Sequence, residues 1–448
     1  MNLKYSLNKV WHSNTQKVMS LTVFGMILSF VMDIAIAAKL GTSQTADSLI
    51  LALTLPIMLD TIIRESTKFS LVPLFMERKM NLNSQEFEYF ISGLCNFGFL
   101  LGIILTILIE FLAPVFIPIL TPNLSIPGQE QTIFLLQVCA PLVIFVPNIT
   151  ILSVLLNSQK NFSTAALRHA VVRGLIVFAI LMYWQSPDIS YMIAASHVVG
   201  FVIFFLMLFV ENYRSGFRYQ WLAFSSLEDI KQLGSFASYP TLGFALGQAS
   251  RLVERLLTSM VAVGGVSAYY YALRIFSSVQ TVVGVSIATT SLPAMTEQNL
   301  AGNQERLTKI IRKNLLNSLK LALPITLVIV LFNKLIISLL YQRGAFDATA
   351  VDLTSQILFW LGLGLTFNCC IPILQSVFYA QQRYRSVFLN MVLLVIVNLG
   401  LAWLLSQTIG LIGISIALSV AVAVATGNVI LMLRRLGIYI IPQFKRKH

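Results

Sequence analysis

Apolar runs long enough to cross a lipid bilayer recur along the whole chain, and they constrain its fold more than any other feature. A helix of about 20 apolar residues spans the hydrocarbon core and satisfies its own backbone hydrogen bonds there. The chain is 57% hydrophobic and 11% charged, whereas a soluble domain is about 25% charged. The sequence therefore predicts an all-α polytopic membrane protein with about twelve transmembrane helices. The runs lie near 18–38, 46–64, 89–112, 131–155, 170–185, 190–210, 236–262, 267–290, 317–340, 353–378, 386–406 and 411–433.

Basic residues occupy alternate loops between these runs. They gather at both termini and after the second, fourth, sixth, eighth and tenth runs, as Arg78, Arg168, Arg214, Arg312 and Arg383 illustrate. The positive-inside rule then places both termini in the cytoplasm. Most of the formal net charge of +13 is therefore topological, and we expect no nucleic-acid partner. The sequence also lacks a P-loop or another nucleotide fingerprint, so we expect no nucleotide.

A polar loop at 211–235 divides the chain into two halves, 1–210 and 236–448, with six predicted helices each. Short sequence matches suggest that the halves repeat, and they bring Asp33 of the first helix into register with Glu254 of the seventh. Six helices per half preserve orientation, so we expect two parallel lobes around a central cavity. Transporters built in this way bind cargo between repeats and alternate access by rocking them.

The stretch from Gln248 to Glu297 carries the most telling charges. Arg251, Glu254 and Arg255 are three and four residues apart, so a helix presents them as one charged stripe. Arg274 opens the next apolar run. Charges at membrane depth are costly, and they usually face a bundle interior or a watery cavity. We interpret these two helices as the lining of a transport path for an anionic, lipid-linked cargo.

Four stretches resemble the MurJ/MviN lipid II flippases of the MOP superfamily. They are Asp33–Gly41 with Ala46-Asp47 and Leu55-Pro56, then Glu65–Pro73, then Gly265–Arg274 with the run to Pro293, and Arg343–Asp347. The resemblance implies a flippase in the bacterial inner membrane that moves undecaprenyl-pyrophosphate-linked saccharide, a peptidoglycan precursor, to the outer leaflet. It also implies membrane lipids and cell-envelope synthesis proteins as partners.

The resemblance implies several site residues. Arg274 is the one residue of the family's cationic cluster that stands in place, and Arg251, Arg255 and Arg64 would supply further charge from nearby positions. Asp47 would also bind substrate, and Asp33 and Asp60 would couple or pair charges. Arg343, Gly344 and Phe346 would shape an outer gate, although a tight turn at Gly344 is the simpler interpretation. A helix N-cap equally explains Asp47, and Asp60 with Arg64 forms either a charge pair or a gate.

The chain also departs from this family. Met26 and Met32 stand where the family places arginines in helix 1, and Asp60 stands near an expected arginine of helix 2. The family usually has about fourteen helices, and a partner in place of the two missing ones is conceivable. A flippase for another lipid-linked oligosaccharide, such as an exopolysaccharide repeat unit, is therefore the second hypothesis.

Coupling stays open at this point. Glu254 and Asn398 match two positions of a sodium site, but the expected acidic partner is Ala402. Na⁺, H⁺ or membrane potential would each serve as the driving force, and an ion pair of Glu254 with Arg251 or Arg255 is the alternative to coupling.

Three other function classes fit less well. A membrane enzyme needs convergent catalytic groups, but the longest expected outward loop, 113–130, has Glu130 as its one ionisable residue, with Glu110 at its edge. The four cysteines lack zinc-ligand spacing, so we expect no metal centre. A drug exporter of the same superfamily would favour an acidic pocket for cations. A scaffold or lipid sensor would leave the intramembrane charges without a purpose.

Overall fold

The structure is a computed structural model that describes residues 2–159, 161–221, 223–224 and 226–439. Within helices it describes no side chains at 2–17, 19, 67–70, 72–73, 76, 227, 229–230 and 232–240, so several basic residues of the predicted topology lie outside the described side chains. The described residues are helical and contain no strand, as predicted. They divide into two compact units, Met1–Phe244 and Ala245–His448. The division falls inside α9, whereas the sequence analysis placed it at the polar loop 211–235.

Eleven stretches among the described residues are long and apolar enough to cross a membrane, and each overlaps one predicted run. The run predicted at 236–262 coincides with most of α9 (Leu227–Val261), part of whose side chains lie outside the described ones. The prediction of a long outward loop at 113–130 is wrong, because most of these residues are helical. Helix α3 (Ser84–Leu120) accommodates Pro114 and Pro118 and continues to Leu120, and α4 (Ile126–Cys139) begins after five intervening residues.

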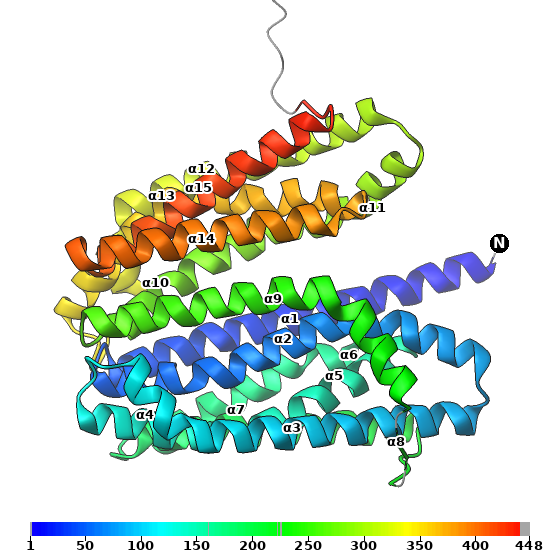
Figure 1. The fold of residues 1–448 in the computed structure, drawn as a ribbon, viewed down its shortest axis with the longest axis horizontal. Helices are drawn as coiled ribbons and strands as arrows, with labels where there is room; N and C mark the ends of the chain where they lie inside the picture. Colours follow the sequence, from blue (N-terminus) through cyan, green and yellow to red (C-terminus); the bar gives the residue numbers. More distant parts are fainter. Residues whose placement is uncertain (1, 160, 222, 225, 440–448) are drawn as a thin grey trace, which may run out of the picture. The chain divides into compact units, whose positions relative to one another are not determined.

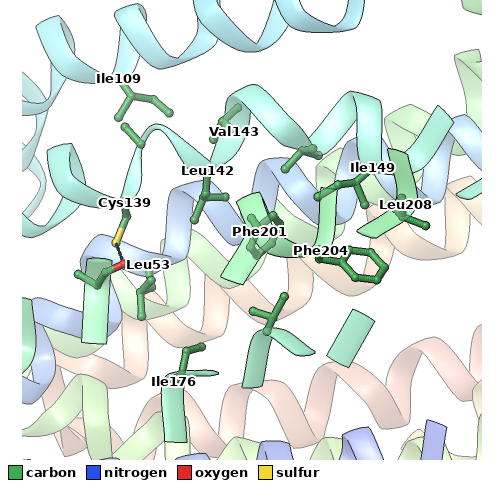
Figure 2. Close-up of a cluster of buried hydrophobic side chains, with 14 of the residues drawn as sticks. Leu53, Ile109, Cys139, Leu142, Val143, Ile149, Ile176, Phe201, Phe204 and Leu208 are labelled. Carbon is green, nitrogen blue, oxygen red and sulfur yellow. Dashed lines mark hydrogen bonds between the residues drawn. The ribbon is translucent and has the colours of Figure 1, made fainter. Parts of the chain in front are cut away.

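Unit 1 contains the helices α1 to α8, which precede α9 and share one continuous core. Its first two helices are α1 (Asn2–Leu40) and α2 (Gln44–Asn81), and α4 is followed by α5 (Leu142–Ser158), α6 (Ser163–Ala166), α7 (Arg168–Met182) and α8 (Ile189–Arg214). Helix α1 packs on α7, α7 on α8, and α5 on α2, α3 and α8. Figure 2 shows Leu142, Val143 and Phe204 in this core, where each is fully buried.

A break between α4 and α5 interrupts one span of unit 1. Pro141 supplies no backbone N–H, so the helix ends at Cys139 and restarts at Leu142. The hydroxyl of Thr106 on α3 donates to the Ala140 carbonyl at 3.2 Å. The same carbonyl accepts from the Val143 N–H at 3.0 Å, so the break is stabilised from within the chain and from α3.

The irregular segment between α8 and α9 is held against α3. The amide of Asn96 donates to the Ala223 carbonyl at 2.8 Å and to the Trp221 carbonyl at 3.1 Å, and Tyr219 donates to Asn96. Partial burial raises the pKa of the Tyr219 phenol. The described part of the expected linker is thus a strap of unit 1 rather than a free connection.

Unit 2 is built around α13 (Ala348–Ala380), whose neighbours are α10 (Gly265–Val279), the π-helix η1 (Gln280–Val285), α11 (Ser286–Leu300), α12 (Gln304–Tyr341) and α15 (Leu411–Arg435). Helix α14 (Tyr384–Ile409) lies beside α15 (Figure 1). Small residues permit these contacts, since a Cβ on Gly284 would lie 2.6 Å from the Cys369 carbonyl oxygen.

The order of helix neighbours recurs in the two units. The contacts of α3 with α5, α5 with α8, and α7 with α8 in unit 1 match those of α12 with α13, α13 with α15, and α14 with α15 in unit 2. In each half, these four helices are the third, fourth, fifth and sixth membrane spans in chain order. The packing therefore supports the internal repeat that the sequence suggested.

The 343–347 stretch forms a tight turn fixed by an aromatic contact. Gly344 has φ of 56°, which favours glycine. The Phe346 ring is buried and lies 5.6 Å from the Tyr271 ring and 5.8 Å from the Tyr341 ring. Asp347 caps α13, accepting from the Ala350 N–H at 2.9 Å, and its hydrogen bond from Thr349 lowers its pKa. Phe346 thus anchors the turn, and an outer gate stays a prediction for Arg343.

Replacing Phe346 with alanine is expected to destabilise unit 2. Removing a buried ring leaves a cavity, which costs about 3 kcal/mol or more of unfolding free energy. The unfolding temperature in detergent micelles should fall by several degrees. Phe111→Ala is the matched control, because the Phe111 side chain is 77% exposed and its loss should leave that temperature unchanged. Equal effects of the two changes would contradict the anchoring role.

Candidate functional site

A buried acidic centre joins α9 and α14 within unit 2. Glu254 is 4% exposed, and three neutral donors surround its carboxylate. Tyr269 donates to Oε2 at 3.0 Å, Ser250 donates to Oε1 at 3.4 Å, and the Asn398 amide also donates to Oε1. Burying a carboxylate requires such donors. The centre therefore brings together two residues that the sequence singled out, Glu254 and Asn398.

This centre lacks the second carboxylate expected of a sodium site. Hard cations prefer several oxygen ligands, usually with carboxylates among them, and here Glu254 is the one carboxylate beside the Ser250 and Tyr269 hydroxyls and the Asn398 amide. Ala402, at the position expected to be acidic, is fully buried and apolar. No group of three His, Cys, Asp or Glu side chains with metal-site geometry occurs among the described residues. Glu254 is thus a hydrogen-bonded carboxylate, in agreement with a role in charge balance or proton binding.

The three charged residues at 251–255 of α9 do not form the expected single stripe. Arg251 is exposed and Arg255 is half-buried, with its guanidinium carbon 5.6 Å from the centroid of the Tyr270 ring. Glu254, between them in sequence, points to the interior of the unit. Glu254 turns away from the two arginines because Tyr269 and Asn398 donate hydrogen bonds to its carboxylate in the interior. Arg255 and Tyr270 form a cation–π contact.

Arg274 lies on α10, half-buried and within the span Gly265–Leu300. The hydroxyls of Ser277 and Ser278 both donate to its backbone carbonyl, Ser278 at 2.7 Å. The π-helix η1 begins six residues later, where the Gln280 amide donates to the Asn368 side chain at 3.0 Å. Single π-turns often occur at functional sites. The sequence analysis missed η1, although the hydroxyl-rich run after Arg274 was a visible signal.

Asp60 of unit 1 has a different main partner from the one expected. Its carboxylate forms an ion pair with Arg168 of α7, and Arg64 Nε lies 3.9 Å from its second oxygen. Arg64 itself forms its shorter pair with Glu65. The sequence analysis placed Arg168 in a basic loop, whereas in the structure Arg168 begins α7 and its side chain is 12% exposed.

Arg173, one turn further along α7, is a residue that the sequence analysis missed. Its Nη1 lies 3.3 Å from His197 Nε2 and 3.3 Å from Met32 Sδ. A single arginine inside an apolar run was a sufficient signal, since intramembrane charge marks functional sites by default.

The remaining predicted residues are distributed over both units. Asp33 of α1 and Asp47 of α2 are fully buried. Asp47 is not the N-cap of α2, because Ser43 accepts from the Ala46 N–H and Asp47 lies in the first helical turn. A negative charge there is favoured by the helix dipole. Arg343 is exposed beside the tight turn, and its guanidinium donates to the Leu339 carbonyl at 2.9 Å.

Relatives of known name share most of the chain. A probable lipid II flippase MurJ of Buchnera aphidicola (from Acyrthosiphon pisum) is 25% identical over 374 residues, which cover 82% of this chain and 72% of that protein. The corresponding protein of Rickettsia prowazekii is 23% identical over 404 residues, covering 90% of this chain and 79% of that protein.

Solved structures show the same fold. Lipid II flippase MurJ in an inward closed conformation has a TM-score of 0.83 at 20% identity and covers 93% of this chain and 87% of that one. An inward-facing multidrug MATE transporter of the MOP superfamily has a TM-score of 0.77 at 14% identity, covering 94% and 98%.

The family model described as lipid II flippase MurJ matches residues 36–447. This match includes both units, the acidic centre of Glu254 and the arginines of α7, α9 and α10. The chain therefore belongs to the MurJ family of lipid II flippases.

Proposed function

We propose that this chain flips a lipid II-type, undecaprenyl-pyrophosphate-linked saccharide from the cytoplasmic to the outer leaflet by alternating access. Membership in the MurJ family supports this function. The observation that carries it in the structure is Arg274, a half-buried cation within a membrane span. A pyrophosphate needs fixed cationic donors, and the planar arginine fork fits phosphate oxygens.

Arg251 and Arg255 would extend the same cationic surface along α9. Arg251 is exposed, so it is accessible to an anionic group. The contact with Tyr270 would hold the Arg255 guanidinium in place. The MATE likeness concerns fold alone, and these arginines are unsuited to a cationic drug. No enzymatic step is required, since translocation breaks no covalent bond.

The proposed setting is a bacterial inner membrane with both termini in the cytoplasm. The alternating basic loops support this topology. H⁺, Na⁺ and membrane potential are the three candidate energy sources, and the single buried carboxylate of Glu254, without an acidic partner at Ala402, favours H⁺ or membrane potential.

Complementation of cells depleted of their own lipid II flippase tests the cargo. The wild-type chain should restore growth, and Arg274→Gln should reduce the transport rate about tenfold or more, because one charged hydrogen-bonding partner is lost. Lys334→Gln is the matched control, since Lys334 forms an exposed ion pair with Asp352. Verified membrane insertion without growth would contradict a lipid II cargo and favour an exopolysaccharide-type cargo.

Replacing external and internal Na⁺ with K⁺ should leave the rate of lipid II flipping in proteoliposomes unchanged. The reason is that the buried, apolar Ala402 stands where a sodium site would have its second carboxylate. Glu254→Gln should lower the rate, because it removes the one ionisable carboxylate of this centre. A rate that rises with Na⁺ concentration in the wild-type protein would refute this assignment.

A further inference from the structure

Glu110 places a carboxyl group at membrane depth on the outside of unit 1. The run 97–120 of α3 is almost entirely apolar, and Glu110 is its one ionisable residue. It lies ten residues before the helix end at Leu120, which is about 15 Å along the axis, or half of the hydrocarbon core. The residue is half-buried, and among the described residues no hydrogen bond or ion pair reaches its carboxylate. A charge at this depth usually has a function.

Gln137 of α4 lies at the same depth, and Pro114 explains half of its bonding. Pro114 has no N–H, so the carbonyl of Glu110, four residues earlier, lacks its usual helical partner. Gln137 Nε2 donates to that carbonyl at 3.2 Å, which satisfies a group that lipid could not satisfy. The second amide N–H and the amide oxygen of Gln137 have no partner in the part of the chain that the structure describes.

Exposed apolar side chains flank this polar pair. Ile107, one turn before Glu110, is 49% exposed, and Phe134, one turn before Gln137, is 54% exposed. Phe134 stacks on Tyr191 of α8, with ring centroids 5.6 Å apart. Helix α4 packs on both α3 and α8 (Figure 1). These five residues of three packed helices form one surface, which we call the seam patch.

A surrounding lipid does not satisfy the polar part of the seam patch. Acyl chains carry no hydrogen-bond donor or acceptor, and the headgroups lie about 15 Å away. Another membrane helix can supply both, and polar side chains within a bilayer commonly hydrogen-bond across helices. The patch has an acceptor, Glu110, beside a donor, Gln137. It is therefore complementary to a second copy of itself, as a two-fold interface requires.

We propose that the seam patch is a dimer interface, in which Glu110 of each copy accepts a hydrogen bond from Gln137 of the other copy. Copies inserted by one cell share one orientation, so their two-fold axis runs along the membrane normal and residues at equal depth meet. The contact forms twice in each dimer. A protonated Glu110 donates to the Gln137 amide oxygen instead, so the contact persists in either state. This association does not depend on the cargo.

The test measures self-association of the purified full chain in liposomes by single-molecule photobleaching, over a range of protein-to-lipid ratios. The wild-type chain should pass from single copies to pairs as the ratio rises. Glu110→Leu should weaken the association about tenfold, because it removes two symmetry-related hydrogen bonds of the strength usual in membranes. Gln356→Leu is the matched control. Gln356 is an exposed polar residue within a span of unit 2, and its loss should not change the association.

An exchange of the two polar side chains tests the pairing itself. Gln137→Glu should weaken association at neutral pH about tenfold or more, because carboxylates then face carboxylates. Adding Glu110→Gln to this variant restores a donor opposite each acceptor and should recover most of the association. Both variants lose the bond from Gln137 to the Glu110 carbonyl equally, so a recovery reports the contact between copies. Glu110→Gln alone retains a donor and an acceptor and should associate like the wild type.

Three results would overturn the dimer interface. The first is a wild-type chain that stays single at every protein-to-lipid ratio, which would leave a different membrane protein as the occupant of the patch. The second is a Glu110→Leu variant with a lower unfolding temperature and unchanged association, since the carboxyl group would then serve the fold. The third is equal association of Gln137→Glu and the exchanged variant, which would show that the two side chains do not meet.

Discussion

The cost of an isolated charge inside a bilayer governs the polar architecture of this protein. Two of the buried carboxylates described above show how that cost is met. Glu254 is surrounded by hydroxyl and amide donors from α9, α10 and α14, and Asp60 is held between guanidinium groups from α2 and α7. Because those donors come from helices distant in sequence, the carboxylates also fix which helices are neighbours. Apolar packing alone specifies neighbours poorly in lipid, since hydrocarbon tails are as apolar as leucine.

The fold was largely predictable from the sequence, because membrane helices follow from length and hydropathy. All eleven spans found among the described residues had been expected, and the charged residues of α9 and α10 were recognised from their cost at membrane depth. Loop boundaries were less predictable. Helix α3 runs on to Leu120 through two prolines, which a simple hydropathy criterion treats as the end of a helix.

The partners of the site residues were not predictable, for a physical reason. Spacing along one helix identifies neighbours at i+3 and i+4, so it suggested Arg64 for Asp60. The ion pair with Arg168 spans 108 positions in sequence and depends on how α2 and α7 pack. Arg168 seemed to belong to a basic loop because an arginine near the end of a span can either fix membrane orientation or form contacts within the protein, and sequence alone does not separate the two. Phe346, assigned to a gate, is a packing residue because Tyr271 and Tyr341 meet it in three dimensions.

The π-helix η1 has a consequence for the helix that contains it. Residues in an α-helix advance by about 100° around the axis, and a π-turn accommodates one residue more than an α-turn. Helices α10 and α11 are therefore two parts of one rod with different rotational phases. If η1 were α-helical, the face of α11 that now meets α13 would be turned by about one residue's angle relative to Arg274. The six residues of η1 thus set the angle around the helix axis between Arg274 on α10 and the face of α11 that packs on α13.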